Sequence, residues 1–132
     1  MSGSPANPRP LYEVRIEHDR KCLRTIMRGF WDRATFEAFA AELRAAEEEM
    51  RSFTGTTYTL VDGVDFEMQD PAITQLFPPL VSSFNLGESR RTAVVMQGAI
   101  ARSQARETGN VVNARYFRTM DEATDWLFSD EA

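Results

Sequence analysis

The sequence has little of the residue types on which most small metal and catalytic centres depend. It holds one cysteine, Cys22, and one histidine, His18. One cysteine excludes an internal disulfide and a cysteine-based zinc site, and it fits a reducing compartment. Without a second histidine, neither a histidine metal pair nor a triad is expected. We therefore expect His18 at the surface and Cys22 packed as a small apolar residue.

Long apolar runs and an excess of basic charge are also missing. The first ten residues, MSGSPANPRP, contain no apolar signal region, and no later run approaches the length of a membrane span. The net charge of -5 argues against a nucleic-acid partner. This net charge does not exclude a local positive patch formed by Arg90, Arg91, Arg102 and Arg106. The sequence predicts a cytoplasmic protein that neither spans a membrane nor binds nucleic acid.

The remaining composition is that of an ordinary globular domain. The chain has 132 residues, 42% of them hydrophobic, with nine phenylalanines. This length predicts one domain with a real core. Residues 1–10 contain three prolines with Ser, Gly and Asn and are predicted to be a flexible tail. The folded domain is expected over residues 11–132.

Hydrophobic periodicity predicts a hairpin and a long helix in the first half. Apolar and charged residues alternate from Tyr12, which indicates an edge strand, and a short polar turn leads to a second strand over Cys22–Gly29. Asp32 is the predicted N-cap of the helix that follows. Its apolar stripe comprises Phe36, Phe39, Ala40, Leu43, Ala46 and Met50. The run Glu47–Glu49 is interpreted as solvated helix surface.

Strands and helices alternate in the second half. Asp70 and Pro71 are typical of a helix start, and this helix should bend at Pro78–Pro79 and end near Gly87. The other predicted elements are strands over Thr57–Val61, Arg91–Met96 and Ala114–Phe117, a helix over Ala99–Glu107 and a final helix from Asp121. The order β-β-α-β-α-β-α-β-α predicts an α/β fold. Its five-stranded sheet should be mainly parallel, with an antiparallel first strand.

Three stretches resemble the STAS domains, which have the SpoIIAA-like fold. They are MRGFWDRATFEAFAAEL, YTLVDGVDFEMQDPAI, and RRTAVVMQGAIARSQARE followed by ARYFRTMDEATDWL. The resemblance to small bacterial STAS-like proteins spans residues 11–128 and implies a binding or regulatory module. Antagonist STAS proteins carry a phosphorylatable serine at the start of the helix after the central strand. Here Val61–Ile73 contains no Ser or Thr and Asp70 stands at the cap, so the serine phosphoswitch is not carried over.

The stretch LVDGVDFEMQDP, residues 60–71, has two interpretations. Asp62, Asp65 and Glu67 are hard-oxygen ligands suited to Mg²⁺ or Ca²⁺, and they follow a parallel strand. Their spacing does not fit an EF-hand loop. The alternative is architecture, with a turn at Asp62–Gly63, a helix cap at Asp70 and solvated carboxylates between them. We favour architecture and predict no metal and no cofactor.

A second candidate site lies in the stretch QGAIARSQAR. Gly98 is placed at a strand-to-helix turn, where free N–H groups can hold an anion with help from Arg102. The stretch matches neither the dinucleotide fingerprint nor the P-loop. A single glycine is a weak signal, so anion binding here is the less favoured interpretation.

Large apolar residues are the most suggestive feature. Five of them are candidates for contact with a ligand or partner: Trp31, Phe66, Phe77, Leu80 and Phe84. Phe30 and Met68 are large apolar residues close to these in the sequence. A helix broken by prolines and flanked by aromatic residues can cover an apolar pocket or form a dimer face. The favoured alternative is that these residues form an ordinary core.

These observations support three functional hypotheses. The first is a non-enzymatic STAS-like module that acts through contact with a regulatory protein or through homodimerisation. The second is a small carrier of an apolar or lipid-like ligand. The third, a carboxylate- or metal-dependent enzyme, ranks last because no base–nucleophile pair or ligand set converges in the sequence. An enclosed apolar cavity would favour the carrier, and a flat apolar patch would favour the dimer.

Overall fold

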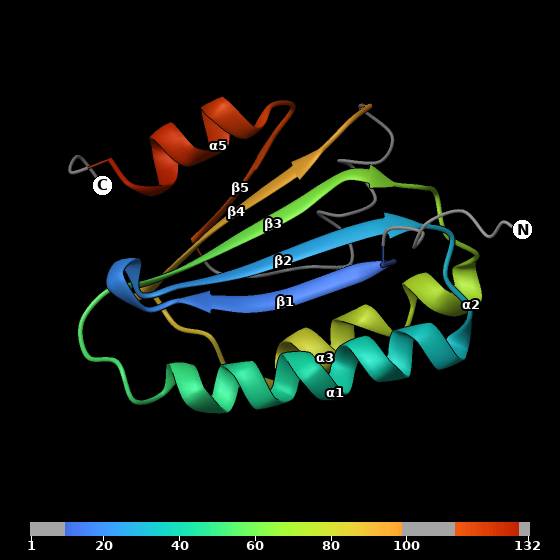
Figure 1. Cartoon of the computed structure of the whole chain (residues 1–132), viewed down its shortest axis with the longest axis horizontal. Helices are drawn as coiled ribbons and strands as arrows, with labels where there is room; N and C mark the ends of the chain where they lie inside the picture. The colour runs from blue at the N-terminus through green and yellow to red at the C-terminus, as the bar shows by residue number, and fades with distance from the viewer. Residues whose placement is uncertain (1–9, 99–112, 130–132) are drawn as a thin grey trace, which may run out of the picture.

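One mixed β-sheet organises the chain. The computed structural model describes residues 10–98 and 113–129. The strands lie in the order β1-β2-β3-β4-β5, with β1 antiparallel to β2 and the other neighbours parallel. This arrangement confirms the predicted fold class (Figure 1). The strand bounds are β1 (Tyr12–Glu17), β2 (Cys22–Gly29), β3 (Thr57–Phe66), β4 (Arg90–Met96) and β5 (Ala114–Phe117).

Helices cover both faces of the sheet. Figure 1 shows α1, α2 and α3 on one face, here called the α1 face, and α5 on the opposite, α5 face. The predicted helix over Ala99–Glu107 lies outside the described residues. Among those described, no helix combines the length and apolar character needed to cross a membrane. The helix bounds are α1 (Arg33–Met50), α2 (Pro71–Thr74), α3 (Phe77–Ser83) and α5 (Met120–Leu127).

The first two strands form the predicted hairpin at the sheet edge. A short 3-10 turn over His18–Arg20 connects them. The alternation in β1 separates its two faces as expected, because Tyr12 and Val14 pack against the buried cluster on the α1 face. On the other face, Glu13 and Glu17 pair with arginines of β2 at 3.1 and 3.3 Å. Hairpin, edge position and facing are confirmed.

Helix α1 begins where the sequence predicts. The Asp32 side chain accepts a hydrogen bond of 2.8 Å from the Thr35 N–H, and this bond lowers the pKa of Asp32. Phe36, Phe39 and Met50 are buried, as the apolar stripe predicts. The interpretation of Glu47–Glu49 as solvated surface is wrong for its first residue. Glu47 is buried and faces the sheet.

The second helical segment is broken, but not where the sequence predicts. Helix α2 ends at Thr74, and α3 begins at Phe77 with Pro78 and Pro79 in its first turn. Proline is tolerated there because first-turn N–H groups have no intrahelical partner. The prolines therefore start a new helix instead of bending an existing one. Helix α3 ends at Ser83, short of the predicted end near Gly87.

Strand β3 is longer than predicted. It continues through Asp62–Gly63, which the sequence analysis placed in a turn, and ends at Phe66. Its register with β2 shifts after Ile26, which pairs with Asp62, because Arg28 pairs with Asp65. This is a β-bulge, in which two residues of β3 oppose one of β2. The Val64 N–H in the bulge donates to the Asp62 carboxylate at 3.2 Å.

The bulge changes the face of the sheet toward which the last side chains of β3 point. Before it, Val61 packs on the α1 face and Leu60 on the α5 face. In a regular strand, side chains alternate, so a residue five positions after Val61 would face the α5 side. Phe66 instead packs on the α1 face. The extra residue is what brings Phe66 to the aromatic cluster.

Candidate functional site

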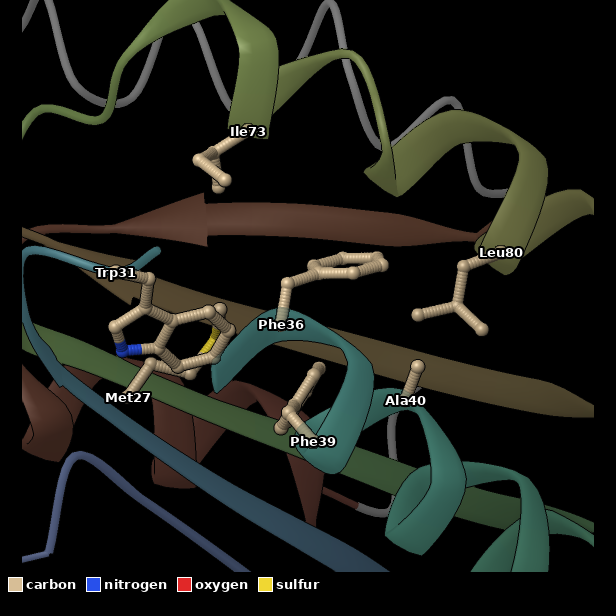
Figure 2. Packing of buried hydrophobic residues seen from close by; sticks show 7 residues of the cluster. All are labelled: Met27, Trp31, Phe36, Phe39, Ala40, Ile73 and Leu80. Carbon is tan, nitrogen blue, oxygen red and sulfur yellow. The ribbon is translucent and has the colours of Figure 1, made fainter. Parts of the chain in front are cut away.

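The predicted apolar candidates gather around Trp31 on the α1 face. Trp31 is 1% exposed. Its ring centroid lies 5.0 Å from those of Phe39 and Phe66 and 6.1 Å from that of Phe77. Figure 2 shows side chains of α1, α2 and α3 converging with Trp31 and Met27. Leu80 is buried in this cluster, and Phe84 packs against it. Much of the candidate set therefore serves as core, the favoured alternative.

A buried glutamine fixes the chain around Trp31. Gln69 Oε1 accepts a hydrogen bond of 2.8 Å from the Trp31 backbone N–H. Gln69 Nε2 donates to the backbone oxygens of Gly29 at 2.8 Å and Glu67 at 2.7 Å. One side chain thus joins the ends of β2 and β3. Sequence reasoning missed this role, because nothing in a single sequence distinguishes Gln69 from its solvated acidic neighbours.

An apolar cavity of about 170 Å³ lies between the sheet and the helices of the α1 face. Four of the five predicted contact residues line it: Phe66, Phe77, Leu80 and Phe84. Trp31 lies behind two of them, stacked near Phe77 and edge-on to Phe66. The exposed residues Glu67 and Met68 also line the cavity, so it reaches the surface at the carboxyl end of β3. These four residues therefore lie together along one cavity, and their contact with a ligand or partner stays a prediction.

Three threonines stand on the sheet floor of this cavity. Thr25, Thr59 and Thr92 are 3%, 7% and 5% exposed. Threonine at such positions buries a hydroxyl where valine would bury only carbon. The charged groups among the described lining residues are Glu47 and Glu67. The cavity is thus apolar with a few polar groups on one side, the usual composition of a small-molecule site.

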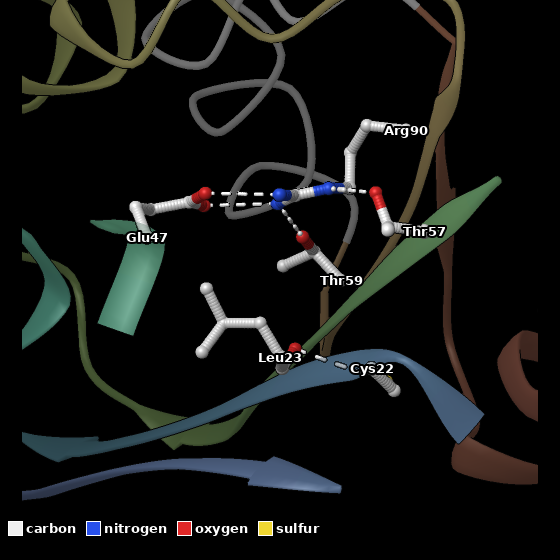
Figure 3. Close-up of polar contacts among 6 residues, drawn as sticks. All are labelled: Cys22, Leu23, Glu47, Thr57, Thr59 and Arg90. Atoms are coloured by element: carbon white, nitrogen blue, oxygen red, sulfur yellow. Dashed lines mark hydrogen bonds and ion pairs between the residues drawn. The ribbon is translucent and has the colours of Figure 1, made fainter. Parts of the chain in front are cut away.

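Glu47, which lines the cavity, belongs to a buried ion pair. Figure 3 shows Arg90 meeting Glu47 through two parallel hydrogen bonds, both of 2.9 Å. The same guanidinium donates to the hydroxyl oxygens of Thr57 and Thr59, each at 2.8 Å. Both charged side chains are 8% exposed. The two charges neutralise each other, and the cluster joins α1 to β3 and β4.

The arginine patch considered from sequence does not form at its first two members. Arg90 is buried in the ion pair, and Arg91 is buried on the α5 face. Arg91 donates to the backbone oxygens of Trp126 at 2.6 Å and Ser129 at 3.1 Å, where it satisfies carbonyls at the end of α5. Strand β4 accordingly begins at Arg90, one residue before the predicted start. Arg102 and Arg106 lie outside the described residues.

The predicted anion site is described only at its glycine. Gly98 follows β4 with a φ of +83°, a conformation that favours glycine, and it is exposed. Arg102, its predicted partner, lies outside the described residues. Anion binding at this turn stays a prediction.

The single cysteine and histidine are placed as predicted. Cys22 is fully buried, and burial raises the pKa of its thiol to about 11. The thiol is therefore protonated at neutral pH, and Cys22 is packed instead of reactive. His18 is exposed at the hairpin turn and contacts the Glu49 carboxylate at 2.7 Å. Neither residue reaches the cavity.

Two aspartates of the acidic stretch accept hydrogen bonds from backbone N–H groups. Asp62 accepts from the bulge N–H, and Asp70 accepts from the Ala72 N–H at 2.9 Å, which confirms the predicted helix cap. Asp65 is the backbone register partner of Arg28 in the β2–β3 ladder. Within residues 10–98 and 113–129, no three side chains of His, Cys, Asp or Glu come together as a metal site would require.

We expect Asp70→Ala to destabilise the protein by about 0.5–2 kcal/mol, because α2 loses its N-cap. The loss should be the same with and without millimolar Mg²⁺ or Ca²⁺, since a metal stabilises only the state that binds it. Thermal unfolding with each ion measures both effects. A saturable rise in melting temperature that Asp65→Asn abolishes would show that the stretch binds metal.

Comparison with known proteins identifies the fold. No family model matches the chain, and no curated protein matches it. A solved structure of an uncharacterised DUF3478-family protein from Shewanella loihica PV-4, described as having a SpoIIAA-like fold, is similar. The TM-score is 0.63 and the sequence identity 18%, over 95% of this chain and 99% of that one. The likeness confirms the SpoIIAA-like fold expected from the resemblance, and it carries no activity with it.

Proposed function

We propose that this protein is a non-enzymatic binding module whose cavity on the α1 face holds a small apolar molecule. The observation that supports the proposal is the position of the cavity. Its walls are the aromatic and aliphatic residues of β3 and α3, and its floor is the centre of the sheet. A well-formed apolar cavity with few polar groups is the default candidate for a ligand site. This is the second of the three functional hypotheses.

The cavity volume limits the ligand. A dry cavity of about 150 Å³ lined by Leu, Ile and Phe holds one benzene molecule. The volume here, about 170 Å³, is close to that value. It lies below the roughly 300–1,000 Å³ of pockets for drug-sized molecules. The ligand, or the part of it that enters, is therefore the size of one aromatic ring or a short aliphatic chain.

The lining residues support binding more than catalysis. Nucleophilic catalysis needs a nucleophile within hydrogen-bond reach of a base. Among the described lining residues, the buried carboxylate is Glu47, and both of its oxygens accept hydrogen bonds from Arg90. Cys22 packs in the cluster on the α5 face, away from the cavity. We therefore continue to propose that the protein is not an enzyme.

Toluene is the probe that tests the cavity. We expect it to raise the melting temperature saturably and to shift the methyl NMR signals of Val61, Val94 and Leu80, because it binds only the folded state. Ala114→Phe, on the cavity side of β5, should abolish both effects by filling the space. The matched control is Arg115→Phe, which introduces the same ring one position away on the opposite face of the strand. Unchanged spectra near the solubility limit of toluene would reject the proposal.

A second candidate function is contact with a protein, including a second copy of this chain. The exposed large apolar side chains among the described residues are Leu11, Phe30 and Met68, at 40%, 56% and 58% exposure. All three lie near Gly29. The Leu11 side chain packs against Gly29, and Phe30 follows it in the chain. Met68 follows Glu67, whose N–H donates to the Gly29 oxygen at 3.2 Å. The sequence analysis considered the proline-broken helix as a dimer face, but Leu80 of α3 is buried in the core of the monomer. A homodimer stays a prediction, and light scattering at micromolar concentration tests it.

A further inference from the structure

Strand β1 is an edge strand whose outer backbone groups are directed away from the sheet. Among the described strands, it pairs with β2 alone (Figure 1). The Leu11 oxygen accepts a hydrogen bond of 2.8 Å from the Arg28 N–H, so every second residue from Leu11 onward bonds to β2. The N–H and C=O groups of Tyr12, Val14 and Ile16 therefore point outward, where they can pair with another strand.

The charged side chains of β1 alternate in sign on the α5 face of the sheet. Glu13 and Glu17 pair with arginines of β2. Arg15 lies between them, is exposed, and has Arg24 of β2 as its register partner. Like charges directly opposite each other in a sheet are unfavourable. A carboxylate on the outer side of β1 would offset this repulsion.

A second copy of β1 supplies such a carboxylate in one register. If two β1 strands run antiparallel with Val14 opposite the partner's Val14, then Glu13 lies opposite the partner's Arg15, and the twofold axis repeats this pair. Two other registers keep the same side chains on each face of the sheet and lie next to this one. One sets Glu13 opposite the partner's Glu13, and the other sets Arg15 opposite the partner's Arg15. Charge therefore selects the register centred on Val14.

The backbone fits the same register. Its hydrogen-bonded pairs are Val14 with the partner's Val14 and Tyr12 with the partner's Ile16, whose N–H and C=O groups point outward in the monomer. Each such pair exchanges two N–H···O bonds. Glu13 and the partner's Arg15 then form a non-hydrogen-bonded pair, the kind in which side chains approach most closely. Apolar and aromatic side chains meet on one face and opposite charges on the other.

We propose that β1 is a dimer interface, at which it pairs antiparallel with β1 of a second copy of this chain about a twofold axis at Val14. The two five-stranded sheets then continue as one. A contact through one short strand is small, so we expect dissociation in the micromolar to millimolar range. No residue of β1 is among the described lining residues of the cavity. The dimer is therefore independent of the proposed ligand, and a failed toluene titration leaves it standing.

Charge exchange tests the register. Arg15→Glu should raise the dissociation constant of the dimer about tenfold or more, because both contacts between positions 13 and 15 become like-charged. The monomer should be equally or more stable, since the new carboxylate faces Arg24. Glu13→Arg should weaken the dimer in the same way. An equimolar mixture of the two variants should recover the affinity, because every pair between positions 13 and 15 is again of opposite charge.

The matched control is Arg118→Glu, the same change of charge at an exposed residue just after β5. It should leave the dissociation constant unchanged. Analytical ultracentrifugation from micromolar to millimolar concentration measures the association of each variant, and circular dichroism shows that each is folded.

Val14→Pro tests the backbone contact without changing charge. The Val14 N–H points away from β2, so proline removes no hydrogen bond to β2 and should abolish the dimer while the monomer stays folded. The proposal is wrong if the wild type stays monomeric at millimolar concentration, or if folded Arg15→Glu and Val14→Pro dimerise as the wild type does. Folded charge variants that do not pair when mixed refute the register. Dimerisation only after removal of residues 1–9 would show that the tail occupies the edge instead of a second copy.

Discussion

Replacing Glu47 by glutamine should destabilise the protein by about 3–5 kcal/mol, because it leaves the buried guanidinium of Arg90 without a counter-charge. Both side chains are 8% exposed and joined by two hydrogen bonds of 2.9 Å. Water cannot replace the lost carboxylate at so little exposure. Urea unfolding followed by circular dichroism measures the loss.

The same helix provides the control for this prediction. Glu48 pairs with Arg51 at 3.0 Å, but both side chains are well exposed. Glu48→Gln should therefore change the stability by no more than about 1 kcal/mol. A loss in Glu47→Gln as small as this would show that the ion pair is effectively solvated.

A double variant separates the pairing from the burial. Glu47→Met with Arg90→Met replaces both charges by apolar groups, and such replacements are often neutral or stabilising. We expect the double variant to recover much of the stability lost in Glu47→Gln. Thr57 and Thr59 would lose the donor that they share, so recovery should be incomplete. The remaining loss combines the unpaired hydroxyls of the two threonines with the packing of the two methionines.

The sequence predicted the elements whose determinants are local. The hairpin follows from alternation over a few residues, and its second strand, Cys22–Gly29, has the predicted bounds. The caps at Asp32 and Asp70 follow from one side chain and the N–H groups within three residues of it. In each case the structure depends on neighbours in the chain, and these are visible in the sequence.

Glu47 shows why longer-range features were missed. It follows Ala40 by seven residues and Leu43 by four, so its position lies on the apolar stripe of α1. Its charge nevertheless suggested solvated surface. The structure buries it because Arg90, from a strand far along the chain, provides the opposite charge. A single sequence does not show which distant charges meet, although an acidic residue on an apolar stripe is a usable signal.

The candidate site was predicted only in part, because some of its determinants are also long-range. Aromatic residues beside a proline-broken helix indicated a pocket, and Phe66, Phe77, Leu80 and Phe84 do line one. The bulge that turns Phe66 toward them depends on pairing between β2 and β3, which the sequence does not specify.

Trp31→Ala should destabilise the protein by about 3–5 kcal/mol, the usual range for removing a large aromatic side chain from a core. Trp31 is 1% exposed, and its Nε1 donates a hydrogen bond of 2.9 Å to the Arg28 oxygen. Alanine would remove this bond and the ring that supports Phe66 and Phe77, so toluene affinity should fall as well.

The control for Trp31→Ala is its neighbour, since Phe30→Ala removes a ring that is 56% exposed and should change stability by about 0.5 kcal/mol or less. Trp31→Phe should lie between the two, because it retains an aromatic ring and loses the donor to Arg28. Urea unfolding of the three variants gives the order. If Trp31→Ala is no more destabilising than Phe30→Ala, Trp31 is not the centre of this core, and the walls of the cavity must be held by other residues.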